Sequence, residues 1–184
     1  KNEYLQVIER FTSEQVKGNF SVKPTMFGLL INKDVCYNYL REIVVLAASK
    51  NSFVRIDMED SQCVDMEMDI FRRLRREFPK NVGLVVQAYM RRTLSDLESL
   101  NDLNSDINPI SFRLCKGIYV EPENIEFKDF HEVRQHFMED LNRSTVTYCQ
   151  YGDNRMKPTD IWHNSEWQPR AMCKNGDSCH QSAP

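Results

Sequence analysis

Four residues that can bind or polarise a ligand stand at regular intervals in the first two thirds of the chain. Lys23, Asp57, Gln87 and Arg113 are separated by 34, 30 and 26 residues, and one strand-helix unit is about 30 residues long. Two cations, a carboxylate and an amide suit a charged, polar ligand. Arg113 and the nearby Lys116 flank apolar residues, so each must be paired, exposed at a strand end or directed at a charged ligand, because burying an unpaired charge is costly.

The segments that must position these residues alternate between two kinds. Four runs have the apolar, β-branched character of strands: NFSVK, FVRID, GLVVQ and ISFRLCK. Four helical segments follow them in turn, over residues 33–49, 64–78, 92–103 and 127–141. This repeated order predicts an α/β fold, with parallel strands joined by crossover helices over about the first 141 residues.

The polar residues occupy equivalent places, since each lies at or near the carboxyl end of its strand. Ligands of α/β barrels and open α/β sheets bind outside that end. In VRID, Val54 and Ile56 should face the covering helices, while Arg55 and Asp57 face the other way. We therefore expect the four strand-end side chains to converge in a single pocket.

Each of these residues also has a structural interpretation. Asp57 could cap the helix that follows it, and Lys23 could be a solvated strand end. Gln87 could be a satisfied core amide, and Arg113 could pair with Asp57 in a purely structural network. Recurrence at four strand ends favours a shared site, because helix capping explains at most one of the four.

Composition limits the class of protein. The chain has 184 residues, of which 41% are hydrophobic and 28% charged, with a net charge of −3, so we expect a packed domain and no nucleic-acid binding. The first residues, KNEYLQVIERF, lack the apolar region of a secretory signal. Three cysteines inside apolar runs suit a reducing compartment, and we expect a cytoplasmic protein. The arginines of FRRLRREF suggest a solvated helix face, with an anionic membrane surface as the alternative.

The last part of the sequence, residues 142–184, is rich in Asn, Asp, Gly, Pro and Ser and is expected to be an irregular tail. Four potential zinc ligands occur there: Cys149, Cys173, Cys179 and His180. Their spacing does not match a structural zinc site, so no metal is expected. The NRS motif at residue 142 would accept a glycan only in a secreted chain.

Four sequence blocks, in order, carry a resemblance to a known family: SVKPT, FVRIDMEDS, VGLVVQAYMRRT and RLCKGIYVEP. Over about residues 4–141 the chain resembles the proline dehydrogenases, specifically the monofunctional bacterial type. The resemblance implies part of a distorted (β/α)8 TIM barrel that holds FAD. It also implies oxidation of L-proline to 1-pyrroline-5-carboxylate, with electrons passed to a membrane quinone and possible peripheral contact with the inner membrane.

The resemblance also assigns roles to individual residues. Asp57 and Arg113 become catalytic residues, and Lys23 meets the carboxylate of proline. The residues implied to contact the cofactor are Met58, Gln87, Arg113, Lys116, Gly117 and Ile118. Among them, Arg113 is placed beside the flavin N5, where a positive charge stabilises the electron-rich reduced ring.

Two departures from the family pattern set the limits of these expectations. Ile118 stands where the family usually has alanine. The family's blocks for the FAD phosphates and adenine, and its paired arginines for the proline carboxylate, are not found after residue 141. A (β/α)8 barrel has eight strands, and only four are evident here. We therefore divide the chain into a barrel portion, residues 1–141, and a tail, residues 142–184, of unknown role. The alternative is a truncated, catalytically impaired fragment that acts only as a structural or interaction protein.

Overall fold

A computed structural model describes residues 1–138, 142–147 and 158–163 of the chain. Its contacts divide the chain into two units, Lys1–Val133 and Arg134–Pro184. The first unit contains all the strand ends identified in the sequence.

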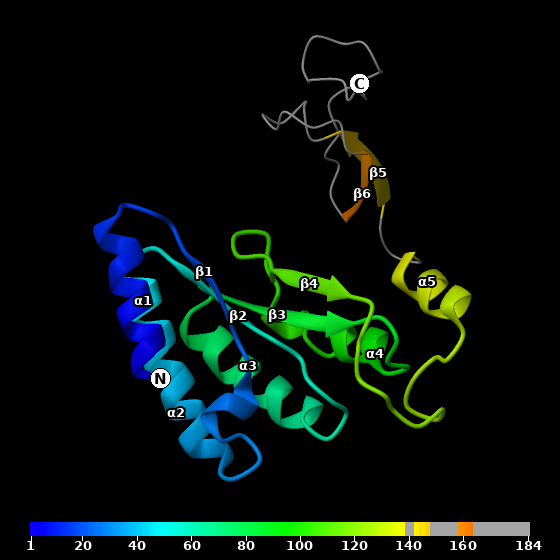
Figure 1. The fold of residues 1–184 in the computed structure, drawn as a ribbon, viewed down its shortest axis with the longest axis horizontal. Coiled ribbons are helices and arrows are strands. Elements are labelled where there is room, and N and C mark those ends of the chain that lie inside the picture. Colours follow the sequence, from blue (N-terminus) through cyan, green and yellow to red (C-terminus); the bar gives the residue numbers. More distant parts are fainter. Residues whose placement is uncertain (139–141, 148–157, 164–184) are drawn as a thin grey trace, which may run out of the picture. The chain divides into compact units, whose positions relative to one another are not determined.

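The first unit is built on one parallel sheet. Its strands are β1 (Asn19–Val22), β2 (Phe53–Ile56), β3 (Val82–Gln87) and β4 (Phe112–Cys115). They lie in the order β1-β2-β3-β4, and each pairs in parallel with its neighbour (Figure 1). This confirms the prediction of four sequential parallel strands. The sheet is open, as expected for part of a barrel that closes with eight strands.

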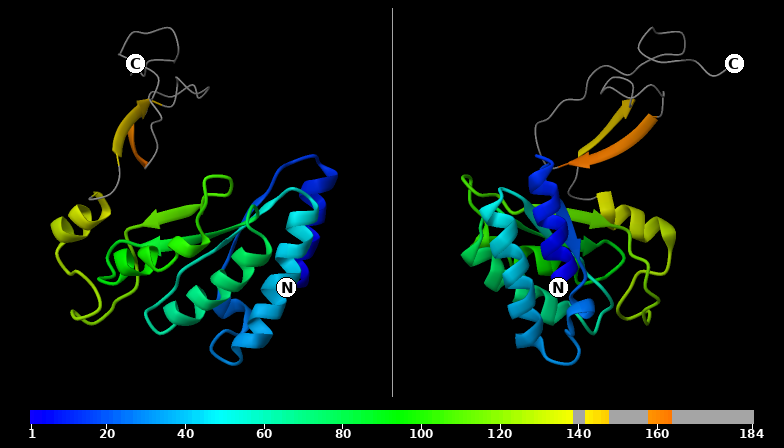
Figure 2. Two further views of the ribbon diagram at one scale, coloured as in Figure 1. Left: turned by 180° about the vertical axis from the view of Figure 1, so that it is seen from behind. Right: turned by 60° about the vertical axis from the view of Figure 1, so that its left-hand side comes forward.

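Helices cover one face of this sheet (Figures 1 and 2). α2 (Lys33–Ser49) packs on β2, and α3 (Val64–Glu77) packs on β3. Val54 and Ile56 are completely buried, as their predicted orientation toward the helices requires. Burial of these apolar faces stabilises the layer, and the alternate side chains face away from the helices.

The first helix, α1 (Asn2–Ser13), was not predicted. Its apolar residues Tyr4, Ile8 and Phe11 recur at helical spacing, a signal that the sequence does contain. Ile8 is completely buried, α1 contacts α2, and Phe11 meets Phe20 of β1 edge to face. The helix therefore extends the covering layer beyond β1.

The later helices are shorter than predicted. Residues 92–103 form α4 (Thr93–Glu98) and a 3-10 turn, η2 (Asn101–Leu103), because the Ser, Asn and Asp residues of this stretch compete for backbone hydrogen bonds. α5 spans Phe130–Met138 within the predicted residues 127–141. Its start is set by Asp129, whose Oδ1 accepts hydrogen bonds from the backbone N–H groups of His131 and Glu132.

The second unit corrects the expectation of an irregular tail. β5 (Asn142–Thr147) and β6 (Pro158–His163) form an antiparallel pair, so residues 142–147 and 158–163 are strands and not loop. The potential zinc ligands lie outside the described residues. The domain boundary after residue 141 stays a prediction. Within the described residues, no helix is both long enough and apolar enough to cross a membrane.

Candidate functional site

The candidate site centres on an ion pair that crosses the sheet. Arg113 Nη2 donates to Asp57 Oδ1 at 2.6 Å, and Arg113 Nη1 donates to Ser21 Oγ at 3.2 Å. Val85 of β3 is the register partner of Arg113. The Arg113 side chain therefore passes over β3 and ties β4 to both β2 and β1, on the face opposite the helices.

This arrangement decides between two interpretations of Asp57. The N-cap residue of α3 is Cys63, and no side chain caps that helix. Asp57 accepts from Arg113 instead, so the capping interpretation is wrong. The pairing that the sequence allowed as a structural alternative is present.

Gln87 lies two residues further along the strands than the level of Arg113, toward their carboxyl ends. Its register partner is Cys115, two residues beyond Arg113. Its side chain is buried, and Nε2 donates to the main-chain oxygen of Glu59 at 2.7 Å. The Gln87 amide thus links the end of β3 to the loop after β2.

Lys23 is exposed, and within the described residues its ammonium group has no hydrogen-bond or ion-pair partner. It follows Val22, whose register partner Ile56 precedes Asp57, so Lys23 and Asp57 end neighbouring strands. The described contacts thus join Asp57 to Arg113 and Gln87 to Glu59. A common pocket for all four residues stays a prediction.

Glu59 is a residue that the sequence analysis missed. Its two carboxylate oxygens accept from the backbone N–H of Thr25, at 2.9 Å, and from the Thr25 hydroxyl, at 2.7 Å. Together with the Gln87 bond, Glu59 connects the ends of β1, β2 and β3. Its position two residues after Asp57 was a usable signal, because alternate residues of an extended segment share a face.

The loop after β4 carries three of the predicted cofactor contacts. Lys116 lies with Nζ 4.6 Å from the centre of the Phe130 ring. Gly117 has a φ of 112°, and a Cβ there would lie 2.2 Å from the Tyr89 ring, so this close approach requires glycine. Ile118 is 83% exposed, whereas Met58 on the loop after β2 is buried.

A second arginine shapes the electrostatics of the same face. Arg55 is buried, and its Nη2 donates to Ser111 Oγ at 2.9 Å. The pKa of Arg55 is lowered, first by burial and then by the positive charge of Arg113, while Asp57 opposes the shift. Only Arg113 of these two cations pairs with Asp57 within the described residues, so the face carries an excess positive charge that favours an anionic or electron-rich ligand.

A buried carboxyl group underlies the loop after β2. Glu67 of α3 is completely buried, and burial is the main reason that its pKa rises to about 8. The nearby carboxylates of Glu59, Asp60 and Asp57 add to the shift. Glu67 Oε2 accepts from the Glu59 backbone N–H at 3.1 Å and opposes the shift in part, while Oε1 has no partner within the described residues.

These residues fit the ring system of a flavin. The Arg113 side chain is 46% exposed on the open face, so its free donors are accessible to a ligand. Gly117 lets the loop backbone lie against Tyr89, and the exposed Ile118 supplies apolar surface next to it. These residues match the flavin ring alone, for which a cation and an apolar contact are the expected elements.

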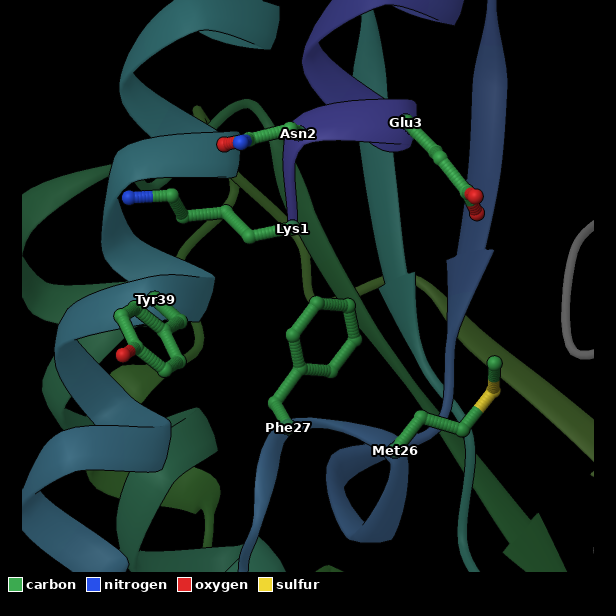
Figure 3. A pocket seen from close by; sticks show the side chains of 6 residues that line it. All are labelled: Lys1, Asn2, Glu3, Met26, Phe27 and Tyr39. Atoms are coloured by element: carbon green, nitrogen blue, oxygen red, sulfur yellow. The ribbon is translucent and has the colours of Figure 1, made fainter.

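A separate cavity of about 630 Å³ lies near the amino terminus (Figure 3). Its lining residues are Lys1, Asn2, Glu3, Met26, Phe27 and Tyr39. None of the strand-end residues lines it. The cavity is therefore distinct from the candidate site at the carboxyl ends of the strands.

Sequential parallel strands with helices on one face define part of an α/β barrel. A family profile described as proline dehydrogenase matches residues 1–153. The chain therefore belongs to the proline dehydrogenase family. The match extends beyond residue 141, where the recognisable sequence blocks ended.

Curated relatives agree with this assignment. Proline dehydrogenase 2 of Bacillus subtilis strain 168 is 30% identical over 144 residues, which cover 78% of this chain and 46% of the relative. The proline dehydrogenase of Deinococcus radiodurans is 31% identical over 140 residues, covering 74% of this chain and 44% of the relative. The chain thus spans a little under half the length of these relatives.

Solved structures show the same fold. Proline utilization A from Bdellovibrio bacteriovorus, inactivated by N-propargylglycine, superposes with a TM-score of 0.66 at 22% identity, covering 75% of this chain and 18% of that one. A mutant of the Bradyrhizobium japonicum protein of the same name gives 0.63 at 14% identity, covering 75% and 17%. At these identities the likeness supports the barrel fold.

Proposed function

We propose that this chain forms the part of a proline dehydrogenase barrel that faces the flavin ring of FAD, in an enzyme that oxidises L-proline to 1-pyrroline-5-carboxylate. The observation that carries the proposal is the half-exposed Arg113 of β4, held by Asp57 and Ser21 on the sheet face opposite the helices. Family membership supplies the reaction class. When bound, FAD would accept a hydride from the substrate, which carries both electrons that proline loses, while the ring nitrogen of proline gives up a proton.

The residues of this chain have distinct tasks in that reaction. Arg113 places a fixed positive charge where the reduced ring is electron-rich, and Asp57 fixes its orientation. Lys23 supplies a point charge for the carboxylate of proline. Gln87, Met58 and the segment Lys116–Ile118 would hold the ring edge and its surroundings. The product has its double bond between the ring nitrogen and Cδ, so these groups must orient the Cδ–H bond toward the acceptor.

The electron acceptor and the location follow from the same proposal. We infer that electrons pass to a quinone, which resides in the membrane, and that the protein is cytoplasmic with peripheral contact at the inner membrane. Family resemblance supports this part. A reconstitution with vesicles that contain a quinone, compared with vesicles that lack it, tests whether reduced quinone accumulates with L-proline.

The flavin spectrum of the purified chain tests the proposed activity. The chain is mixed with FAD, separated from free cofactor, and its visible spectrum is recorded before and after L-proline is added without oxygen. Retained flavin supports the proposal that this chain faces the ring, and bleaching by L-proline but not by D-proline would show that the chain also positions the substrate. A colourless protein supports the alternative of a structural fragment.

A further inference from the structure

The buried carboxylate of Glu121 joins two loops that carry predicted flavin contacts, the loop after β2 and the loop after β4. We call its contact with Ser61 the Glu121 clamp. Glu121 is buried, and its Oε1 accepts from the Ser61 backbone N–H at 2.7 Å. Its Oε2 accepts from the Ser61 hydroxyl, also at 2.7 Å. The two residues are 60 positions apart in the sequence. The geometry repeats that of Glu59 and Thr25, in which one carboxylate takes both the amide and the hydroxyl of one residue.

The Glu121 clamp fixes the residue at which the loop after β4 ends. At the start of this loop, the Lys116 backbone oxygen accepts from Tyr89 N at 2.9 Å. Ile118 and Val120 are then 83% and 93% exposed. Glu121 ends this exposed stretch by bonding to Ser61, on the loop that also carries Met58.

The segment that follows Glu121 in the chain is also held by hydrogen bonds. Lys128 Nζ donates to the Glu121 backbone oxygen at 2.5 Å. Beyond it, Phe127 N donates to the Tyr89 oxygen at 2.8 Å, and Arg91 N donates to the Ile125 oxygen at 3.0 Å. The segment after Glu121 is therefore held to the end of β3, and Glu121 is the point at which the loop also meets the loop after β2.

We propose that Glu121 is a positioning residue that holds the Lys116–Ile118 loop in the conformation that receives the flavin. The inference rests on the proposed function for its ligand, while the loop contact itself does not. Glu121 acts through Ser61 and the loop backbone. Two charge-assisted hydrogen bonds to one buried carboxylate stabilise a fixed loop length, which limits the conformational freedom that FAD would otherwise have to remove.

Two measurements on the 184-residue chain test this role. Amide hydrogen exchange without FAD reports whether residues 116–121 and Ser61 are held by the clamp, and quenching of flavin fluorescence reports FAD affinity. Glu121→Ala and Ser61→Ala should each speed exchange in this loop. Each should weaken FAD binding by about 10- to 100-fold, the loss expected for a charge-assisted bond. The double variant should lose no more affinity than Glu121→Ala alone.

Matched variants separate this role from a general loss of stability. Ser61→Thr keeps the amide and the hydroxyl and should restore both slow exchange and FAD affinity. Glu123→Ala removes an exposed carboxylate from the same loop and should leave both unchanged. If Glu121→Ala does not fold, Ser61→Ala, which keeps the amide bond, gives the same test.

The results of these measurements distinguish failure of the positioning role from failure of the proposed function. Unchanged exchange in Glu121→Ala, or faster exchange with unchanged FAD affinity, would overturn the positioning role. A parent chain that binds no FAD overturns the proposed function. In that case exchange alone decides whether Glu121 holds the loop: faster exchange supports this contact, and unchanged exchange refutes it.

Discussion

Arg113 and Asp57 form an ion pair whose two partners differ in exposure. The Arg113 side chain is 46% exposed and that of Asp57 only 17%, with 2.6 Å between Arg113 Nη2 and Asp57 Oδ1. Asp57 is thus the enclosed partner that fixes the direction of the guanidinium, while Arg113 keeps donors accessible on the open face. An orienting carboxylate beside an accessible cation is the arrangement expected of a preorganised electrostatic site.

The first prediction concerns Arg113. In a protein that also supplies the other half of the barrel, Arg113→Ala should lower the rate of proline oxidation on the order of 10² to 10³, the scale of losing one preorganised donor. Arg113→Lys should not restore it, because a lysine cannot reach Asp57 and Ser21 together with a planar fork. A dye-linked proline assay measures both. Arg10→Ala, which breaks an exposed pair on α1, is the control, and an unchanged rate for Arg113→Ala contradicts the assignment.

The second prediction concerns the chain by itself. The 184 residues contribute four strands, and Lys23 is a poor geometric substitute for an arginine that grips a carboxylate with two parallel bonds. We expect weak or no turnover of L-proline by this chain in a dye-linked assay with added FAD. Robust turnover would show that four strands suffice.

The third prediction follows from the buried carboxyl group of Glu67. Its pKa is raised from an ordinary value of 4.5 to about 8, so the folded chain keeps a proton that the unfolded chain releases. The free energy of unfolding should therefore fall as pH rises between these values, by up to about 1.4 kcal/mol per pH unit. Glu67→Gln removes this contribution, so the free energy of unfolding of the variant should change less with pH over this range than that of the parent.

Urea unfolding between pH 5 and pH 9 measures this effect, at intervals of about one unit to resolve the slope. Other groups titrate in this range, so the informative quantity is the difference between the parent and Glu67→Gln. Glu98→Gln, at an exposed position of α4, should follow the parent. A parent and a Glu67→Gln variant with parallel pH profiles would contradict the raised pKa.

The fourth prediction concerns the crossing point of Arg55 over β3. Gly83 is the register partner of Arg55, and a Cβ at Gly83 would lie 2.6 Å from the Ser111 backbone oxygen and 2.8 Å from the Phe53 ring. Gly83→Ala should therefore destabilise the chain by about 1 to 3 kcal/mol, the usual cost of overpacking. Thermal and urea unfolding measure the loss. A free energy of unfolding equal to that of the parent would contradict this prediction, because it would show that the strands next to Gly83 move apart without loss of stability.

Sequence patterns predicted the sheet because each apolar strand and each amphipathic helix carries its own periodicity. They did not predict register. Gln87 is the last residue of β3, whereas Arg113 is the second residue of β4, so that Val85 is opposite Arg113 and Gln87 is opposite Cys115. The prediction that Arg113 lies at the same level as Gln87 is therefore wrong, because β4 continues for two residues beyond Arg113.

The loop contacts were hidden for a different reason. Glu59 bonds across 34 residues to Thr25, and Glu121 bonds across 60 to Ser61. Each carboxylate lies in a loop with no periodic pattern, and its partner is determined only by which loops meet beyond the ends of the strands. The ion pair between Asp57 and Arg113 was foreseen as an alternative, although the sequence does not show that it reaches across β3.

The most direct test of the flavin-facing site is an equilibrium titration of the 184-residue chain with FAD, followed by flavin fluorescence. Our account predicts saturable binding by the parent and by Arg10→Ala, and a clear loss of affinity in Arg113→Ala, because the accessible guanidinium beside Asp57 is the charge that the ring meets. A parent chain that binds no FAD, or an Arg113→Ala variant that binds it as tightly as the parent, would contradict the account.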